Sequence, residues 1–160
     1  MDQPDDLRYS EKITSNRTEA LFLALTGLFL ALHLWRMSQA GLDFLAGLFL
    51  LFCVVFLFYA INYRTLTIQI NTASLRLKFG LFGWTVPLDN IETASLDELP
   101  AFMKYGGAGI HFMTIRNRYR ASFNFLEYPR VVIAFKKKAG LVRDISFSTR
   151  RPEEILGLLP

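Results

Sequence analysis

Cysteine and histidine are scarce in this chain, which limits the metal chemistry that it can carry. One cysteine, Cys53, and two histidines, His33 and His111, occur among 160 residues. A single cysteine cannot form an intrachain disulfide, and the chain has no cysteine cluster of the kind that holds a structural zinc ion. Cys53 lies inside a long apolar run, where we expect it to act as a small packing residue.

Charge is nearly absent from the 42 residues between Ala20 and Ile61, where only Arg36 and Asp43 are charged. These two residues separate two apolar blocks, the second of which runs for 18 residues without a charge. As a helix, 18 residues extend about 27 Å, close to the roughly 30 Å thickness of the hydrocarbon core of a bilayer. We therefore predict a transmembrane helical hairpin, with helices over about residues 18–37 and 43–62.

Two alternatives to this hairpin need to be weighed. A helical hairpin in the core of a water-soluble protein is one, but the second apolar block has no polar face to turn towards water. A cleaved signal peptide is the other, because Ser38-Gln39-Ala40 offers the small residues that a signal peptidase requires. The first apolar block is long for a signal peptide, so we expect both helices to remain in the protein.

Lysine and arginine are distributed unevenly around the hairpin. Three precede the first helix and three follow the second, whereas the turn holds only one. Positive charge near helix ends favours the cytoplasmic side. We expect a two-pass protein of the inner (cytoplasmic) membrane with both termini cytoplasmic, a cytoplasmic leader over 1–17 and a cytoplasmic β-domain over 63–160. The seven residues are Arg8, Lys12 and Arg17, then Arg36 in the turn, then Arg64, Arg76 and Lys78.

From Tyr63 onward the pattern changes to alternation of apolar and polar residues, which is typical of half-buried strands. The segments "TLTIQIN" and "LRLKF" form the first expected hairpin, and "RPEEILGLL" forms a closing helix with Pro152 in its first turn. "SLDELPAFMKYGGAGI" is expected to be an irregular connection. The count is about seven short antiparallel strands in a small barrel or sandwich. The further strands are expected at "WTVPL", His111–Arg116, Arg120–Phe125, "VVIAF" and "DISFS".

Four segments in this order resemble the bacterial pleckstrin-homology-like (PH-like) domain proteins, a membrane-flanked family: "LRLKFGLFGWTVPLDNI", "KYGGAGIHF", "YRASFNF" and "ISFSTRRPEEI". The resemblance covers about residues 64–158. It implies an all-β PH-like barrel with a C-terminal capping helix and no enzymatic activity, and it supplies no catalytic residues.

The first predicted helix carries a row of small residues at spacings of four, three and four, which places them on one face. Small residues allow close approach of another helix in lipid. We expect this face to pack against a partner, either the second helix or a helix of another protein. The residues are Ala20, Ala24, Gly27 and Ala31.

The residues from Tyr63 onward include 14 lysines and arginines against 8 acids. Three groups of them are candidates for a basic surface that binds anionic lipid or a protein partner. The alternative is the ordinary charged surface of a basic membrane protein. Nucleic acid is not expected as a partner, because the aromatic residues are not interleaved with the basic ones. The groups are Arg116, Arg118 and Arg120; Lys136, Lys137 and Lys138; and Arg150 and Arg151.

Candidates for chemistry are few. His33 is an ionisable residue near the end of a predicted membrane helix, where an imidazole can ligate a pigment or haem. It also lies beside Trp35 and Arg36, close to the interface, where polar groups reach water. No nucleophile pattern surrounds His111, and "YGGAGI" lacks the Lys-Ser/Thr of a phosphate loop. We expect no enzyme and no metal site.

Three functions follow as hypotheses. The first is a non-catalytic accessory or assembly subunit that docks on a larger integral membrane protein complex. The second is a module that binds the anionic lipids of the phospholipid bilayer. The third is a subunit that carries a cofactor at His33.

Overall fold

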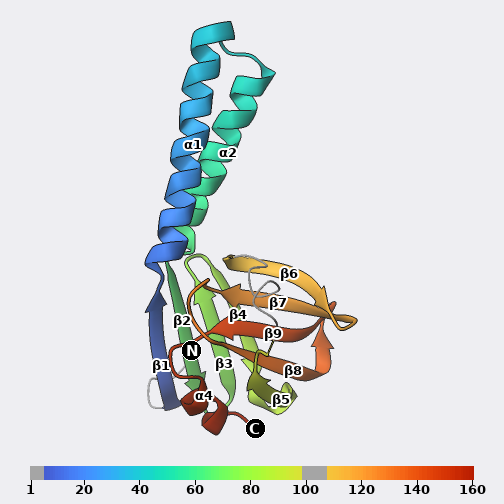
Figure 1. The fold of residues 1–160 in the computed structure, drawn as a ribbon. Coiled ribbons are helices and arrows are strands. Elements are labelled where there is room, and N and C mark those ends of the chain that lie inside the picture. Colours follow the sequence, from blue (N-terminus) through green and yellow to red (C-terminus); the bar gives the residue numbers. More distant parts are fainter. Residues whose placement is uncertain (1–5, 99–107) are drawn as a thin grey trace.

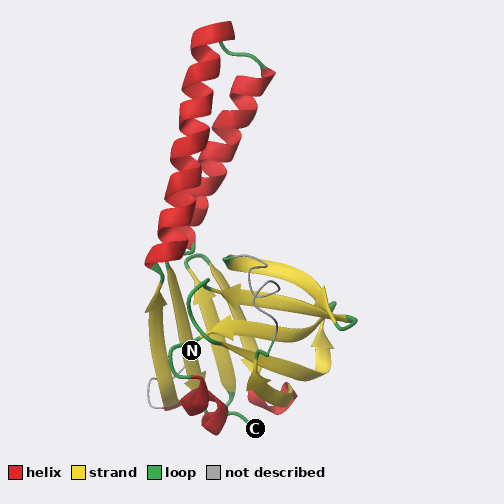
Figure 2. Ribbon diagram, viewed as in Figure 1, coloured by secondary structure: helices red, strands yellow, loops and turns green. Residues whose placement is uncertain are grey.

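The computed structural model describes residues 6–98 and 108–160, which form a helical hairpin standing on a β-domain (Figure 1). One strand precedes the hairpin, and all other described strands follow it. Helices and strands are separated in space, since the two long helices extend away from the sheets (Figure 2).

The hairpin consists of α1 (Asn16–Ala40) and α2 (Phe44–Asn62). At 25 and 19 residues, the helices are about 37 and 28 Å long. Ser15 and Asp43 cap them by accepting bonds from first-turn backbone N–H groups, at 3.0 and 2.8 Å. Both helices are long and apolar enough to cross a membrane, and only 6% and 17% of their most apolar windows are buried. Such exposure distinguishes them from helices of a soluble core.

A four-stranded antiparallel sheet continues directly from the hairpin. In sheet order its strands are β1 (Leu7–Thr14), β2 (Thr65–Asn71), β3 (Ser74–Phe79) and β4 (Phe82–Pro87). Thr14 pairs with Thr65, so the strands that lead into and out of the helices are neighbours. Alternate residues face inward, and Leu66, Ile68 and Ile70 are fully buried.

A short 3-10 helix, η2 (Leu88–Asn90), leads from β4 to a second, five-stranded sheet. β7 and β9 pair in parallel, which brings Arg120 opposite Asp144, and the other pairs are antiparallel. In sheet order the strands are β5 (Ile91–Leu96), β8 (Arg130–Ala139), β9 (Val142–Ser148), β7 (Arg118–Asn124) and β6 (Gly109–Ile115).

The inner faces of the two sheets meet in one aromatic and aliphatic core. The ring of Phe79 on the first sheet stacks on Phe123 of the second at 6.1 Å and meets Phe125 edge-on at 5.1 Å. The C-terminal helix α4 (Pro152–Leu158) adds the fully buried Ile155 to this cluster. The predicted closing helix is thus confirmed as part of the core.

The hairpin is fastened to the β-domain at the end of α2. The side-chain oxygen of Asn62 accepts a bond from the backbone N–H of Leu81 at 2.9 Å. Tyr63 packs edge-on against Phe79 at 5.5 Å and also contacts the ring of Phe22 near the start of α1. The helices and the sheets therefore share one continuous set of contacts.

The two predicted long apolar helices are confirmed, whereas the predicted β-domain is confirmed only in part. The described residues contain nine strands in two open sheets; no sheet closes into a barrel, and one pair of strands is parallel. The segment 1–17, expected to be a leader separate from the β-domain, contains β1, which is the edge strand of the first sheet. Most of the expected irregular connection falls on residues 99–107, outside the described residues.

Candidate functional site

The contact between the two long helices is aromatic. The ring of Phe29 on α1 lies 5.1 Å from Phe52 and 5.4 Å from Phe56 on α2. Closer to the β-domain, Phe22 meets Tyr59 edge-on at 5.6 Å. One face of α1 is therefore filled by α2.

The predicted small-residue face of α1 points the other way. Ala20, Ala24, Gly27 and Ala31 are all exposed, and a Cβ atom at Gly27 would have nothing within 4 Å. Of the two partners considered for this face, α2 is excluded by its position on the opposite, aromatic face. The row of small residues remains open to lipid or to a helix of another protein.

His33 bonds to the other helix of the hairpin. Its Nδ1 lies 2.9 Å from the carbonyl oxygen of Ala46, and because a carbonyl only accepts, Nδ1 carries the proton. This leaves Nε2 as the nitrogen that a haem or pigment would use. His111 lies in β6 of the β-domain, and no group of three metal-ligating side chains occurs in residues 6–98 and 108–160. The bond to Ala46 gives His33 a structural role without a cofactor.

The only cation of the hairpin turn is neutralised. Arg36 donates from Nε to Asp43 at 2.9 Å, and the same carboxylate caps α2. The turn therefore carries no net charge from this pair. Arg17 and Arg64, at the β-domain end of the hairpin, also have acidic partners, Glu127 and Glu19.

Arg118 and Arg120 lie side by side on β7, as their alternation predicted, and both face acids. Arg118 Nε is 2.8 Å from Asp144 Oδ1, and Arg120 lies 3.6 Å from both Asp144 and Asp97. Arg120, Asp144 and the side chain of Asp97 are buried. Their charges largely cancel, so the two arginines do not form a free basic surface.

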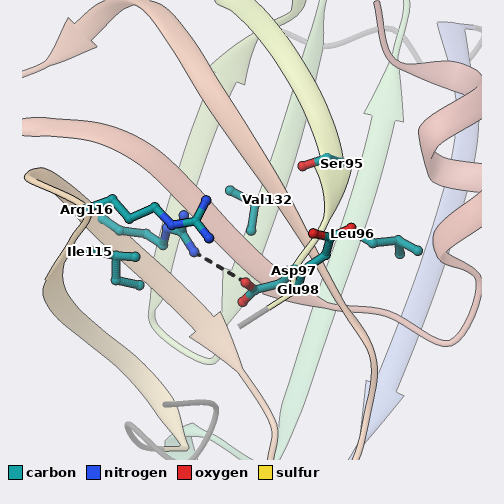
Figure 3. A pocket seen from close by; sticks show the side chains of 8 residues that line it. Ser95, Leu96, Asp97, Glu98, Ile115, Arg116 and Val132 are labelled. Carbon is teal, nitrogen blue, oxygen red and sulfur yellow. Dashed lines mark ion pairs between the residues drawn. The ribbon is translucent and has the colours of Figure 1, made fainter. Parts of the chain in front are cut away.

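Arg116 does not share the strand. It occupies the β6–β7 turn with φ of 47°, followed by Asn117 at 64°, and it is exposed. Its side chain and that of Asp97 line a cleft of about 270 Å³ (Figure 3). Because Asp97 and Glu98 also line this cleft, it does not favour a phosphate or another anion.

His111 is partly buried beside this network. Desolvation by burial and, second, the charge of Arg130 lower the pKa of its imidazole. Both ring nitrogens are buried, and no carboxylate bonds to either of them in the described part of the chain. His111 is thus a neutral imidazole at pH 7 without an orienting carboxylate, which differs from the pattern of a catalytic base.

Lys136, Lys137 and Lys138 are exposed on β8, although "KKKAG" between the expected strands "VVIAF" and "DISFS" predicts a tight turn there. Lys136 donates to the carbonyl oxygen of Asp89, and Lys137 bonds to Asn90, both at 2.9 Å. Asp89 and Asn90 follow β4, which leads away from the hairpin for six residues or about 20 Å. At this distance, salt screens most of the attraction to a bilayer around the hairpin.

Arg150 and Arg151 lie between β9 and α4 and have partners there. Arg150 donates to the hydroxyl of Tyr128 at 3.1 Å and lies 5.2 Å over its ring, and Arg151 pairs with Glu154 at 3.1 Å. The three predicted basic groups are therefore separate, and the structure does not join them into one surface.

A basic groove that sequence reasoning did not select lies on the outer face of the first sheet. Lys12 on β1 and Lys78 on β3 flank Thr67 in one row of the sheet, and Arg76 lies one row further from the hairpin. They line a groove of about 650 Å³. The alternation of β3 gave the outward direction of Arg76 and Lys78, but recognising the groove required knowing that β1 completes the sheet.

No protein-family model matches this chain, and no curated protein matches it significantly.

Proposed function

We propose that this protein is a non-catalytic accessory subunit of a larger integral membrane protein complex. The helical hairpin anchors it in the membrane, and α1 offers its small-residue face, Ala20, Ala24, Gly27 and Ala31, to a helix of the complex. The β-domain lies at the membrane surface, where it covers part of the complex. We further propose that this domain is related to the bacterial PH-like domains, a relation supported by its packed antiparallel sheets and C-terminal helix.

One observation carries this proposal. α2 packs on the aromatic face of α1, and the row of small residues on the opposite face is exposed along the helix. A face of Ala and Gly offers little apolar area to lipid but lets a second helix approach closely. Exposed small residues in an otherwise Leu- and Phe-rich helix therefore favour a helix from another chain as the partner.

The proposed position of the β-domain follows from the strand pairing and the charges. Because β1 and β2 are neighbours, the N-terminal strand and the rest of the β-domain lie at the same end of the hairpin. Of the seven lysines and arginines counted around the hairpin, six lie on the β-domain side, and only Arg36 lies near the turn. These features support a cytoplasmic β-domain at the inner membrane.

The absence of catalysis is part of the proposal. Asp97 and Asp144, two carboxylates of the β-domain with buried side chains, are paired with arginines. This arrangement is typical of structural ion pairs, and it places no nucleophile beside a base.

Native separation after solubilisation in a mild detergent tests the proposal. We expect the wild-type chain to migrate with a complex much larger than itself. Gly27→Leu fills the small-residue face and is expected to release the chain from the complex. Leu30→Phe enlarges an exposed residue of α1 outside that face and is expected to leave the complex intact. Migration of the wild-type chain alone would refute the docking role.

A further inference from the structure

The turn between β3 and β4 exposes large apolar side chains at the base of the hairpin. Leu81 is 82% exposed and Phe82 is 45% exposed. Ile61, in the last turn of α2, is 72% exposed. In Figure 1 this green turn rises to the lower end of α2.

Specific contacts hold the turn at that height. The N–H of Leu81 bonds to the side chain of Asn62, and the ring of Phe82 lies 6.3 Å from the rings of both Phe58 and Tyr63. Phe58 precedes Asn62 by four residues, or about 6 Å along the helix axis. The ring of Phe82 therefore lies beside the final turn of the apolar helix.

Cations lie on the outer face of the sheet, further from the hairpin than this turn. Lys78 pairs with Gly83, the next pair after Phe79 and Phe82 at the turn, so it lies one residue, roughly 3 Å along the strand, further from the hairpin than Phe82. Lys12 shares its row of the sheet, and Arg76 lies in the next. Within the described residues, no ion pair neutralises these three side chains.

We propose that the β3–β4 turn, Gly80–Phe82, is a third contact with the bilayer. Leu81 and Phe82 enter the apolar side of the interface beside α2, and Lys78, Lys12 and Arg76 bind the phosphates of anionic headgroups. The inference rests on the proposed membrane span of the hairpin and deepens it, because it fixes the tilt of the β-domain against the membrane.

The spacing fits a bilayer. Each headgroup layer is about 5–8 Å thick, so a lysine one residue pair back from Phe82 has the phosphates within reach of its side chain. An apolar tip with cations set back from it is the arrangement found in segments that lie in a membrane interface.

The contacts of the β3–β4 turn favour lipid, and not a groove of another protein, as its binding partner. The exposed apolar surface of the turn is continuous with that of α2 through Ile61 and Phe58. If α2 is surrounded by lipid, the side chains beside its last turn meet the same lipid.

Depth measurements with a nitroxide label test this inference. Cys53 is replaced by Ala in the full-length chain, and a single cysteine is introduced at Leu81, Leu141 or Leu50. Leu141 is the matched control, because it occupies another exposed Gly-Leu turn, between β8 and β9, that Figure 1 places away from the helices. Leu50, in the middle of α2, reports on the span itself.

The labelled proteins are reconstituted in vesicles of phosphatidylcholine and phosphatidylglycerol, and accessibility of each label to oxygen and to a water-soluble nickel chelate is compared. We expect the labels at 50 and 81 to favour oxygen and the label at 141 to favour nickel. If the label at position 81 favours nickel, as the label at 141 does, while the label at 50 still favours oxygen, the inference is overturned. The membrane span of the hairpin is then unaffected. A label at 50 that favours nickel overturns the span as well.

Discussion

At the scale of single residues, Glu11 joins the two ends of the chain. This buried carboxylate accepts bonds from the hydroxyls of Tyr9 and Thr149, at 3.0 and 2.6 Å, and from the backbone N–H of Arg150 at 3.1 Å. Strand β1 is thereby tied to the segment that precedes α4. A charged group buried in this way is stable only while its donors remain in place.

Tyr9 makes this site sensitive to alkaline pH. Burial, and then the hydrogen bond and charge of Glu11, raise the pKa of Tyr9 from 10.0 to about 12. The folded protein holds a proton that the unfolded chain releases above pH 10, so this contribution is complete below pH 10 and is lost as the pH rises towards 12. The expected loss of unfolding free energy is about 1–2 kcal/mol.

Thermal unfolding in detergent at pH 8 and pH 11 measures this loss. Tyr9→Phe is expected to unfold with a smaller difference between the two pH values, since every other ionisable group is unchanged. An identical difference in the wild type and the variant contradicts the assignment to Tyr9.

At the scale of the elements, Gly80 is required where the β3–β4 turn meets α2. Its φ is +49°, and a Cβ atom there would lie 2.6 Å from the carbonyl oxygen of Asn62. Gly140, in the β8–β9 turn, has a similar φ of +62° but open space around it. Substitution of Gly140 therefore tests the effect of backbone conformation alone on stability. Substitution of Gly80 tests backbone conformation together with close packing.

We expect Gly140→Ala to cost about 1 kcal/mol of unfolding free energy, the strain of a left-handed backbone. Gly80→Ala adds a clash with backbone atoms and is expected to cost roughly 2–4 kcal/mol. Chemical denaturation in detergent, followed by circular dichroism, compares them. Equal losses would show that the contact between Gly80 and Asn62 does not stabilise the protein.

The long helices were predictable because their signal is local: nearly uncharged apolar runs of helical length, with Asp43 available as a cap. β1 was missed for the opposite reason. Its inward positions hold Tyr9 and Glu11 before Ile13, so the apolar alternation is weak, and its partner β2 follows the entire hairpin. The parallel pairing of β7 with β9 likewise depends on the fold and not on a local pattern.

In the candidate site, too, features with a local sequence pattern were predictable and features that depend on the fold were not. Alternation correctly placed Arg118 and Arg120 on one face, but the acids that neutralise them come from elsewhere in the chain: Asp144 from β9 and Asp97 from the segment after β5. A count of basic residues could not reveal this cancellation. In contrast, helical periodicity sufficed to place the four small residues on one face of α1, whereas the direction of that face depended on the position of α2.

At the scale of the whole molecule, the β-domain is built from two separated pieces of the chain. Thr14 and Thr65 are paired, so the entire hairpin occupies the position of a loop between neighbouring antiparallel strands. Two-residue turns connect such strands readily. This suggests a water-soluble version of the β-domain.

We expect a chain of residues 6–14, Asn-Gly and 65–160 to fold without detergent as a β-rich monomer. A fragment of residues 64–160 lacks β1 and leaves the inward residues of β2 uncovered, so we expect it to be less stable or to aggregate. Gel filtration and circular dichroism compare the two. If the fragment without β1 is equally stable, β1 is dispensable and our description of the domain is wrong.

The pairing of β1 with β2 also has a consequence for biosynthesis. β1 leaves the ribosome well before β2, and in the proposed topology the segment between them enters the membrane before the two strands pair. The first sheet can be completed only when both ends of the hairpin have returned to the same side. Formation of the Thr14–Thr65 pair thus makes the maturation of the β-domain conditional on correct insertion, and a chain whose second helix fails to enter the bilayer is left with an unpaired strand that quality-control proteases can recognise.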